Sequence, residues 1–201
     1  MAVRVKPEVR AEHRRALLAA AARAFAAGGY EAAGIDGISE QAGLGKGTVY
    51  NHFASKRAIF EEVLREACAL AAGSAEAVPD EADTGARLEA FVAGNIAWAL
   101  ERPELAALVA REMLGGTAET RRLIFEASAP CVEKVAAVID RAQRQGELAA
   151  SDSAADLALG FIMLANGLLL QATATGWPSV RSLPATAARL FLRGASAAQA
   201  A

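Results

Sequence analysis

The stretch that most constrains this chain is Gly34–Phe53, which reads GIDGISEQAGLGKGTVYNHF. Its first half repeats apolar residues at the spacing of one helix face, namely Ile35, Ile38 and Ala42. Gly43 follows, and glycine is the residue that most readily ends a helix in a left-handed conformation. A second short helix can begin at Gly45, with Val49 and Phe53 four residues apart on its inner side. The pattern predicts two short helices joined by a tight turn.

The other side chains of the second helix are one cation and four uncharged hydrogen-bonding groups: Lys46, Thr48, Tyr50, Asn51 and His52. These are the chemical groups that contact phosphate oxygens and base edges in protein–DNA complexes. We therefore predict a helix-turn-helix over residues 34–53, with the second helix entering the major groove.

Residues 25–64 resemble the DNA-binding domain of TetR-type transcriptional repressors. The resemblance rests on Phe25, the pair Gly29-Tyr30, the turn Ala42-Gly43-Leu44, the run from Lys46 to Tyr50, the pair His52-Phe53 and the pair Ser55-Lys56. These motifs lie within about the first 60 residues of the chain. It implies an N-terminal three-helix DNA-binding domain, followed by a helical bundle that binds a small-molecule effector and forms a homodimer.

The resemblance also implies roles for individual residues. Lys46 and Tyr50 would hold phosphates, Thr48 and His52 would touch phosphate or base, and Gly47 would let the backbone approach the DNA. The predicted DNA-binding set is Gly45, Lys46, Gly47, Thr48, Tyr50, Asn51, His52 and Lys56. Gly34 and Gly45 stand where the family often has a capping hydroxyl, so contacts at both helix starts must depend more on backbone N–H groups.

Charge is distributed unevenly along the chain. The 201 residues carry a net charge of −2, which argues against a non-specific nucleic-acid coat. Residues 1–57 hold nine Lys and Arg against five acids, whereas the remainder holds twelve against eighteen. A net charge of +4 in the N-terminal part and −6 in the rest suits a polyanion-binding domain joined to a domain that does not bind DNA.

Abundant alanine, leucine and arginine, without alternating strand patterns, predict an all-α fold of about nine helices. Gly73–Gly85 contains Gly, Ser, Pro and acids without an apolar period, and is the expected joint. The predicted domains are therefore 11–71 for DNA binding and 80–195 for ligand binding and dimerisation. Pro130 should kink or divide the helical pattern over 118–145, and Ser151 could cap the apolar helix after it.

Large side chains in the alanine-rich C-terminal part are candidates for a ligand pocket. The residues singled out are Phe91, Asn95, Trp98, Met113, Phe125, Phe161 and Asn166. For any single residue of this set, packing in an ordinary core is the favoured explanation. The two asparagines favour a pocket slightly, because an amide buried among apolar groups needs a polar partner. An apolar or amphipathic ligand would suit such a lining.

The segments 152–175 and 184–193 predict a dimer interface. The first is apolar nearly all round, with Leu157, Phe161, Leu164 and Leu168 on one stripe. A helix of that kind must be covered on every side, and a second copy of the same two helices is the natural cover. A monomer core is the alternative.

Other classes of function find little support in the sequence. Lys46 is followed by Gly47 rather than Ser or Thr, so the local glycines make no nucleotide-binding loop. Two histidines provide neither a catalytic set nor a histidine-based metal site, and we expect no enzyme, cofactor or metal. Cys68 and Cys131, without a CxxC, indicate a reduced, cytoplasmic protein, and no apolar run is long enough to span a membrane. The alternative function is a helical interaction module whose basic hairpin docks on an acidic protein partner.

Overall fold

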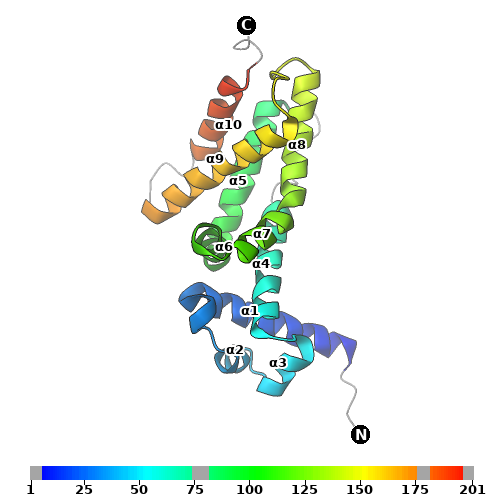
Figure 1. Ribbon diagram of the computed structural model, residues 1–201, viewed down its shortest axis with the longest axis vertical. Coiled ribbons are helices and arrows are strands. Elements are labelled where there is room, and N and C mark those ends of the chain that lie inside the picture. The colour runs from blue at the N-terminus through cyan, green and yellow to red at the C-terminus, as the bar shows by residue number, and fades with distance from the viewer. Residues whose placement is uncertain (1–5, 74–81, 176–181, 197–201) are drawn as a thin grey trace. The chain divides into compact units, whose positions relative to one another are not determined.

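The computed structural model describes residues 6–73, 82–175 and 182–196, with only the backbone described for 169 and 171–175. The described residues form ten α-helices and one isolated β-bridge, between Leu148 and Ser196, which confirms the all-α prediction (Figure 1). The helices are α1 (Pro7–Ala32), α2 (Ile35–Gln41), α3 (Lys46–His52), α4 (Lys56–Gly73), α5 (Thr84–Glu101), α6 (Pro103–Gly115), α7 (Ala118–Ala127), α8 (Ala129–Arg144), α9 (Ala154–Thr175) and α10 (Leu183–Gly194).

The chain forms two compact units, each made from two stretches of sequence. Unit 1 contains residues 1–68 and 102–124, and unit 2 contains 69–101 and 125–201. The α6 helix therefore packs with the N-terminal helices, where it contacts α1. The predicted domains 11–71 and 80–195 remain a prediction, and most of the proposed joint, residues 74–81, lies outside the described residues.

The core of unit 1 is built around aromatic rings. Phe25 is fully buried and packs edge-to-face on Phe60, with ring centroids 5.0 Å apart. Tyr30 lies 4.9 Å from the same Phe60 ring. The chain can place Tyr30 there because Gly29 takes φ 77° and ψ 177°, a conformation that is essentially restricted to glycine. The last turn of α1 is thus bent back onto α4.

The α2–turn–α3 segment has the predicted helix-turn-helix arrangement. Gly43 has φ 67°, the left-handed conformation expected at the end of α2. The Leu44 N–H then donates to the Ser39 carbonyl at 2.9 Å, which closes the turn. Neither Gly34 nor Gly45 supplies a side-chain cap, as their identity requires.

Helix boundaries elsewhere follow local chemistry. The Ser55 hydroxyl accepts a hydrogen bond from the Ala58 N–H at 3.1 Å and caps α4. Pro130 lies in the first turn of α8, so the long pattern is divided there as predicted. The expected cap at Ser151 is wrong. Ser153 caps α9 instead, accepting from the Asp156 N–H at 3.1 Å, because it lies immediately before the first helical residue.

Unit 2 packs α5, α8, α9 and α10 around one apolar core (Figure 1). Phe161 on α9 is fully buried, between Phe91 of α5 and Phe191 of α10, with ring centroids 6.0 and 5.1 Å away. The other side of α9 and part of α10 remain uncovered in the single chain. Met163 is 46% exposed and Leu190 is 52% exposed.

Candidate nucleic-acid interface

The α3 helix separates an apolar inner face from a polar outer face. Val49 is fully buried and Phe53, immediately after the helix, is 6% exposed. Tyr50, by contrast, is 53% exposed. Six of the predicted contact residues are exposed or partly exposed on the same short segment: Gly45, Lys46, Gly47, Thr48, Asn51 and His52. The assignment of Val49 and Phe53 to the core was correct, and the polar groups are accessible to a ligand.

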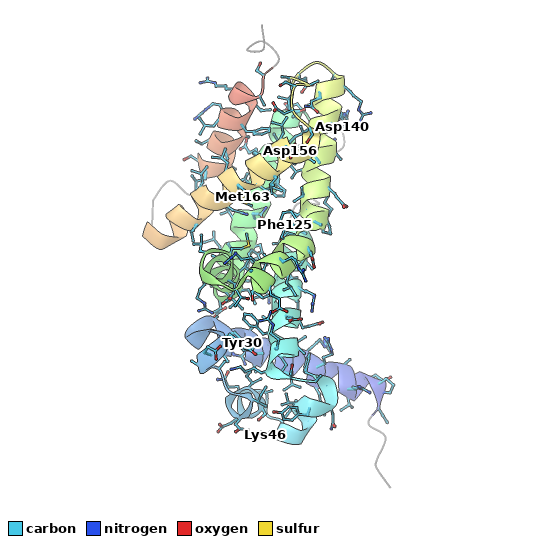
Figure 2. All side chains as sticks on the ribbon, in the orientation of Figure 1. Tyr30, Lys46, Phe125, Asp140, Asp156 and Met163 are labelled. Atoms are coloured by element: carbon cyan, nitrogen blue, oxygen red, sulfur yellow. The ribbon has the colours of Figure 1, made fainter. Side chains whose placement is uncertain are left out.

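Lys46 lies at the tip of unit 1, where α2 and α3 meet (Figure 2). Its ammonium contacts the Asp36 carboxylate of α2 at 2.7 Å, and this hydrogen bond raises the pKa of Lys46. Both side chains are mostly exposed. Since ion pairs between exposed groups are held weakly against solvent, the Lys46 ammonium can exchange the carboxylate for a phosphate.

Lys56 is held against the end of α1. Its ammonium donates to the carbonyl oxygens of Ala33 and Glu31 at 3.0 and 3.3 Å, and lies 4.4 Å from the centre of the Tyr30 ring. Cations stabilise the carbonyl end of a helix and the face of an aromatic ring. In this structure Lys56 ties α4 to α1, and its phosphate contact remains a prediction.

The N-terminal half of α1 adds basic groups beside α3 that the sequence reasoning missed. His13 of α1 meets His52 of α3 edge-to-face, with ring centroids 6.2 Å apart. The Arg14 guanidinium lies over the Phe53 ring at 5.1 Å and is bound by Glu62 of α4 at 2.7 Å. The spacing of Arg10, His13 and Arg14 at i, i+3 and i+4 puts them on one helix face, a signal that was present in the sequence.

The electrostatic setting of His52 follows from these neighbours. Partial burial of the ring lowers the pKa of His52 below its ordinary value near 6.5. Arg10, His13 and Arg14 lower the pKa further, because each opposes a second positive charge. Without DNA, His52 is therefore mainly neutral at pH 7.

The predicted ligand residues of the C-terminal part are divided between the two units and differ in burial. Phe91 and Phe161 pack against one another in the core of unit 2. Met113 lies in unit 1, and Phe125, labelled in Figure 2, is 55% exposed. Asn166 is exposed, and the reasoning from a buried amide does not apply to it.

Two polar groups of α5 behave differently from one another. The Asn95 amide donates to the Phe91 carbonyl in its own helix at 3.0 Å, which satisfies one of its donors locally. The indole Nε1 of Trp98 is buried, and no acceptor in the described part of the chain lies within hydrogen-bond reach. An unpaired buried donor costs about 1–3 kcal/mol. Among the predicted ligand residues, Trp98 is therefore one whose buried polar atom has no hydrogen-bond partner in the described part of the chain.

Unit 2 also carries two open surface pockets. One, of about 590 Å³, lies beside Thr84, Glu147 and Arg193, and the other, of about 460 Å³, lies beside Asp152 and Phe191. Neither is lined by a predicted ligand residue. Within the described ranges, no three His, Cys, Asp or Glu side chains converge as a metal site would require. Among the described helices, none is long and apolar enough to cross a lipid bilayer.

Comparison with known proteins supports the assignment made from the N-terminal residues. Residues 17–63 match the model for bacterial regulatory proteins of the tetR family. The chain is 40% identical over 84 residues to the HTH-type transcriptional activator FasR of Mycolicibacterium smegmatis. That similarity covers 41% of this chain and 38% of FasR, so it spans well under half of the curated relative.

Solved structures extend the similarity to the whole fold. FadR from Bacillus subtilis, in complex with stearoyl-CoA, aligns with a TM-score of 0.80 at 17% identity. The fatty acid degradation regulator FadR from Bacillus halodurans aligns with a TM-score of 0.78 at 17% identity. Each alignment covers 90% of this chain and 98% of the other. Residues 17–63 therefore match the model of the tetR family of bacterial regulatory proteins, and the chain as a whole shares the fold of the FadR structures.

Proposed function

We propose that this protein is a homodimeric repressor that binds operator DNA through α3 and is released by a small apolar or amphipathic ligand. The observation that carries the DNA-binding part is the outer face of α3, where Lys46, Tyr50 and Asn51 are exposed above the buried Val49. A binding role of this kind requires no catalytic group, and we assign none. As a regulator of operator DNA, it would act in the cytoplasm.

The uncovered apolar surface of unit 2 supports the homodimer. Met163, Leu170 and Leu190 on α9 and α10 are each more than a third exposed in the single chain. Large apolar groups gathered on two neighbouring helices are typical of a protein–protein interface. A two-fold dimer would present two α3 helices to half-sites about 34 Å apart.

The first test is binding to a duplex of about 30 base pairs that the protein itself has enriched from a random-sequence pool. If each dimer neutralises about six phosphates, raising salt from about 50 to about 200 mM should weaken binding about a thousandfold, because DNA binding releases counterions. Fluorescence anisotropy at several salt concentrations measures this slope.

Two results of that titration would contradict the proposal. One is the absence of binding to any enriched duplex. The other is binding whose affinity does not fall as the salt concentration rises. Either result would favour the alternative, an interaction module whose basic hairpin docks on an acidic protein. A promoter reporter then separates repression from activation, which matters because FasR is named an activator.

The ligand part of the proposal is supported by Trp98 and by FadR. The unpartnered Nε1 of Trp98 suits a polar group of a bound ligand, and the FadR relative of the same fold was solved with stearoyl-CoA. Stearoyl-CoA is therefore the first probe, with coenzyme A lacking the acyl chain as its matched control.

Adding stearoyl-CoA should change the emission of Trp98 and weaken DNA binding, because a ligand bound at Trp98 would alter the surroundings of the indole and shift the chain away from its DNA-binding state. The measurement uses a Trp177→Phe background, since Trp98 and Trp177 are the two tryptophans of the chain. Coenzyme A alone should have neither effect. Unchanged emission and unchanged affinity with the acyl compound would reject this ligand class.

A further inference from the structure

The two histidines of the chain, His13 and His52, lie against one another beside the DNA-facing surface of α3. Their rings meet edge-to-face, with an interplanar angle of 77°. Both side chains are partly exposed. His52 directly follows Asn51 and Tyr50, so an anion bound along α3 comes close to the histidine pair.

The groups that face this pair are mainly cationic. Arg10 and Arg14 come from the same face of α1 as His13, and both act on His52 electrostatically. Glu62 of α4 is an acid that reaches this cluster, where it is bound to Arg14 at 2.7 Å. Lys46, at the start of α3, is bound to Asp36. In the free protein these surroundings oppose a proton on His52.

We propose that this protein takes up protons when it binds duplex DNA, and that His52, with His13 beside it, holds them. The inference rests on the proposed DNA-binding function. A phosphate at α3 supplies the negative charge that the cluster lacks, and an anion within about 4–6 Å favours the charged form of a histidine. Both nitrogens of a protonated imidazole donate hydrogen bonds, so the proton also adds a donor for the phosphate.

A fall in pH should change the stability of the free protein and its affinity for DNA in opposite directions. In the free protein, folding lowers the pKa of His52, so the unfolded chain binds more protons. The free energy of unfolding should therefore fall as the pH falls below about 6.5. DNA affinity should change in the opposite direction and increase as the pH falls. This opposition separates the proposed coupling from a general loss of structure in acid.

The test measures the dissociation constant for one enriched duplex from about pH 8 to about pH 6 at constant ionic strength. If binding raises the pKa of His52 by about one unit, affinity should increase up to about tenfold per protomer over this range. His52→Gln should remove most of this slope, and Asn51→Gln, a neutral change at the adjacent residue, should keep it. The two variants are compared by the pH dependence of their affinity and not by the affinity itself. Both residues belong to the proposed interface, so either substitution can weaken binding at every pH.

NMR titration gives a direct second measurement that leaves His52 itself unchanged. The chain contains two histidines, so the imidazole signal that remains in His13→Gln belongs to His52. The pKa of His52 should be higher in the DNA complex than in the free protein. An unchanged or lower pKa on DNA would overturn the proposal, as would an equal pH slope in wild type and His52→Gln. Salt-sensitive binding with a flat pH profile refutes the proton coupling alone, whereas no DNA binding at any pH refutes the proposed function as well.

Discussion

Replacing Phe60 with alanine should lower the free energy of unfolding by about 3–5 kcal/mol, the usual cost of removing a buried aromatic ring. Phe60 is 1% exposed, and its ring contacts those of Phe25 and Tyr30, with centroids 5.0 and 4.9 Å away. These contacts join α4 to both parts of α1. The cavity left by the substitution would therefore weaken the packing between α1 and α4 that supports the helix-turn-helix.

Chemical denaturation followed by circular dichroism measures this loss. Phe125→Ala is the matched control, because the same side chain is removed from a position that is 55% exposed. We expect the control to change stability by well under half as much. Equal losses in the two variants would contradict the core assignment of Phe60.

Replacing Tyr50 with alanine should weaken DNA binding while leaving the fold intact. Its side chain is 53% exposed on the outer face of α3. A hydrogen bond from its hydroxyl to a phosphate is worth about 1.5–3 kcal/mol, because the acceptor is charged. Affinity should therefore fall about tenfold to a hundredfold for each protomer in contact with DNA.

Anisotropy with the enriched duplex measures the loss, and analytical ultracentrifugation checks the oligomeric state. Tyr50→Phe separates the hydroxyl from the ring: if the hydroxyl binds phosphate, the two variants should bind equally weakly. Full affinity in Tyr50→Ala would remove this residue from the interface. Loss of the folded or dimeric state in that variant would mean that Tyr50 supports the structure.

The two substitutions should have opposite signatures. Phe60→Ala should reduce stability and affect DNA binding only through the unfolded fraction, whereas Tyr50→Ala should reduce DNA binding at unchanged stability. This contrast follows from the burial of the two side chains, 1% and 53% exposed, on elements of the same unit. Observing this contrast would establish by experiment that Phe60 is a core residue and Tyr50 a DNA-contact residue.

The sequence determined the local structure of the DNA-binding segment. The apolar spacing of Ile38, Val49 and Phe53 sets the inner face of the two helices, and Gly43 takes the left-handed conformation that the turn needs. Pro130 divides α7 from α8 for an equally local reason. Such features depend on residues a few positions apart, so their physical cause can be read without knowing the fold.

Only the tertiary structure decided which distant residues meet. It tied Lys56 to the end of α1 and Tyr30, and it packed α6 with unit 1, where Arg111 donates to the Ala26 carbonyl at 3.0 Å. It also brought His13 of α1 against His52 of α3. The hydrogen bonds join residues that are 23 to 85 positions apart along the chain, and the two histidines are 39 positions apart. Periodicity cannot predict them, because it orders residues within a helix but does not select the helix that each one faces.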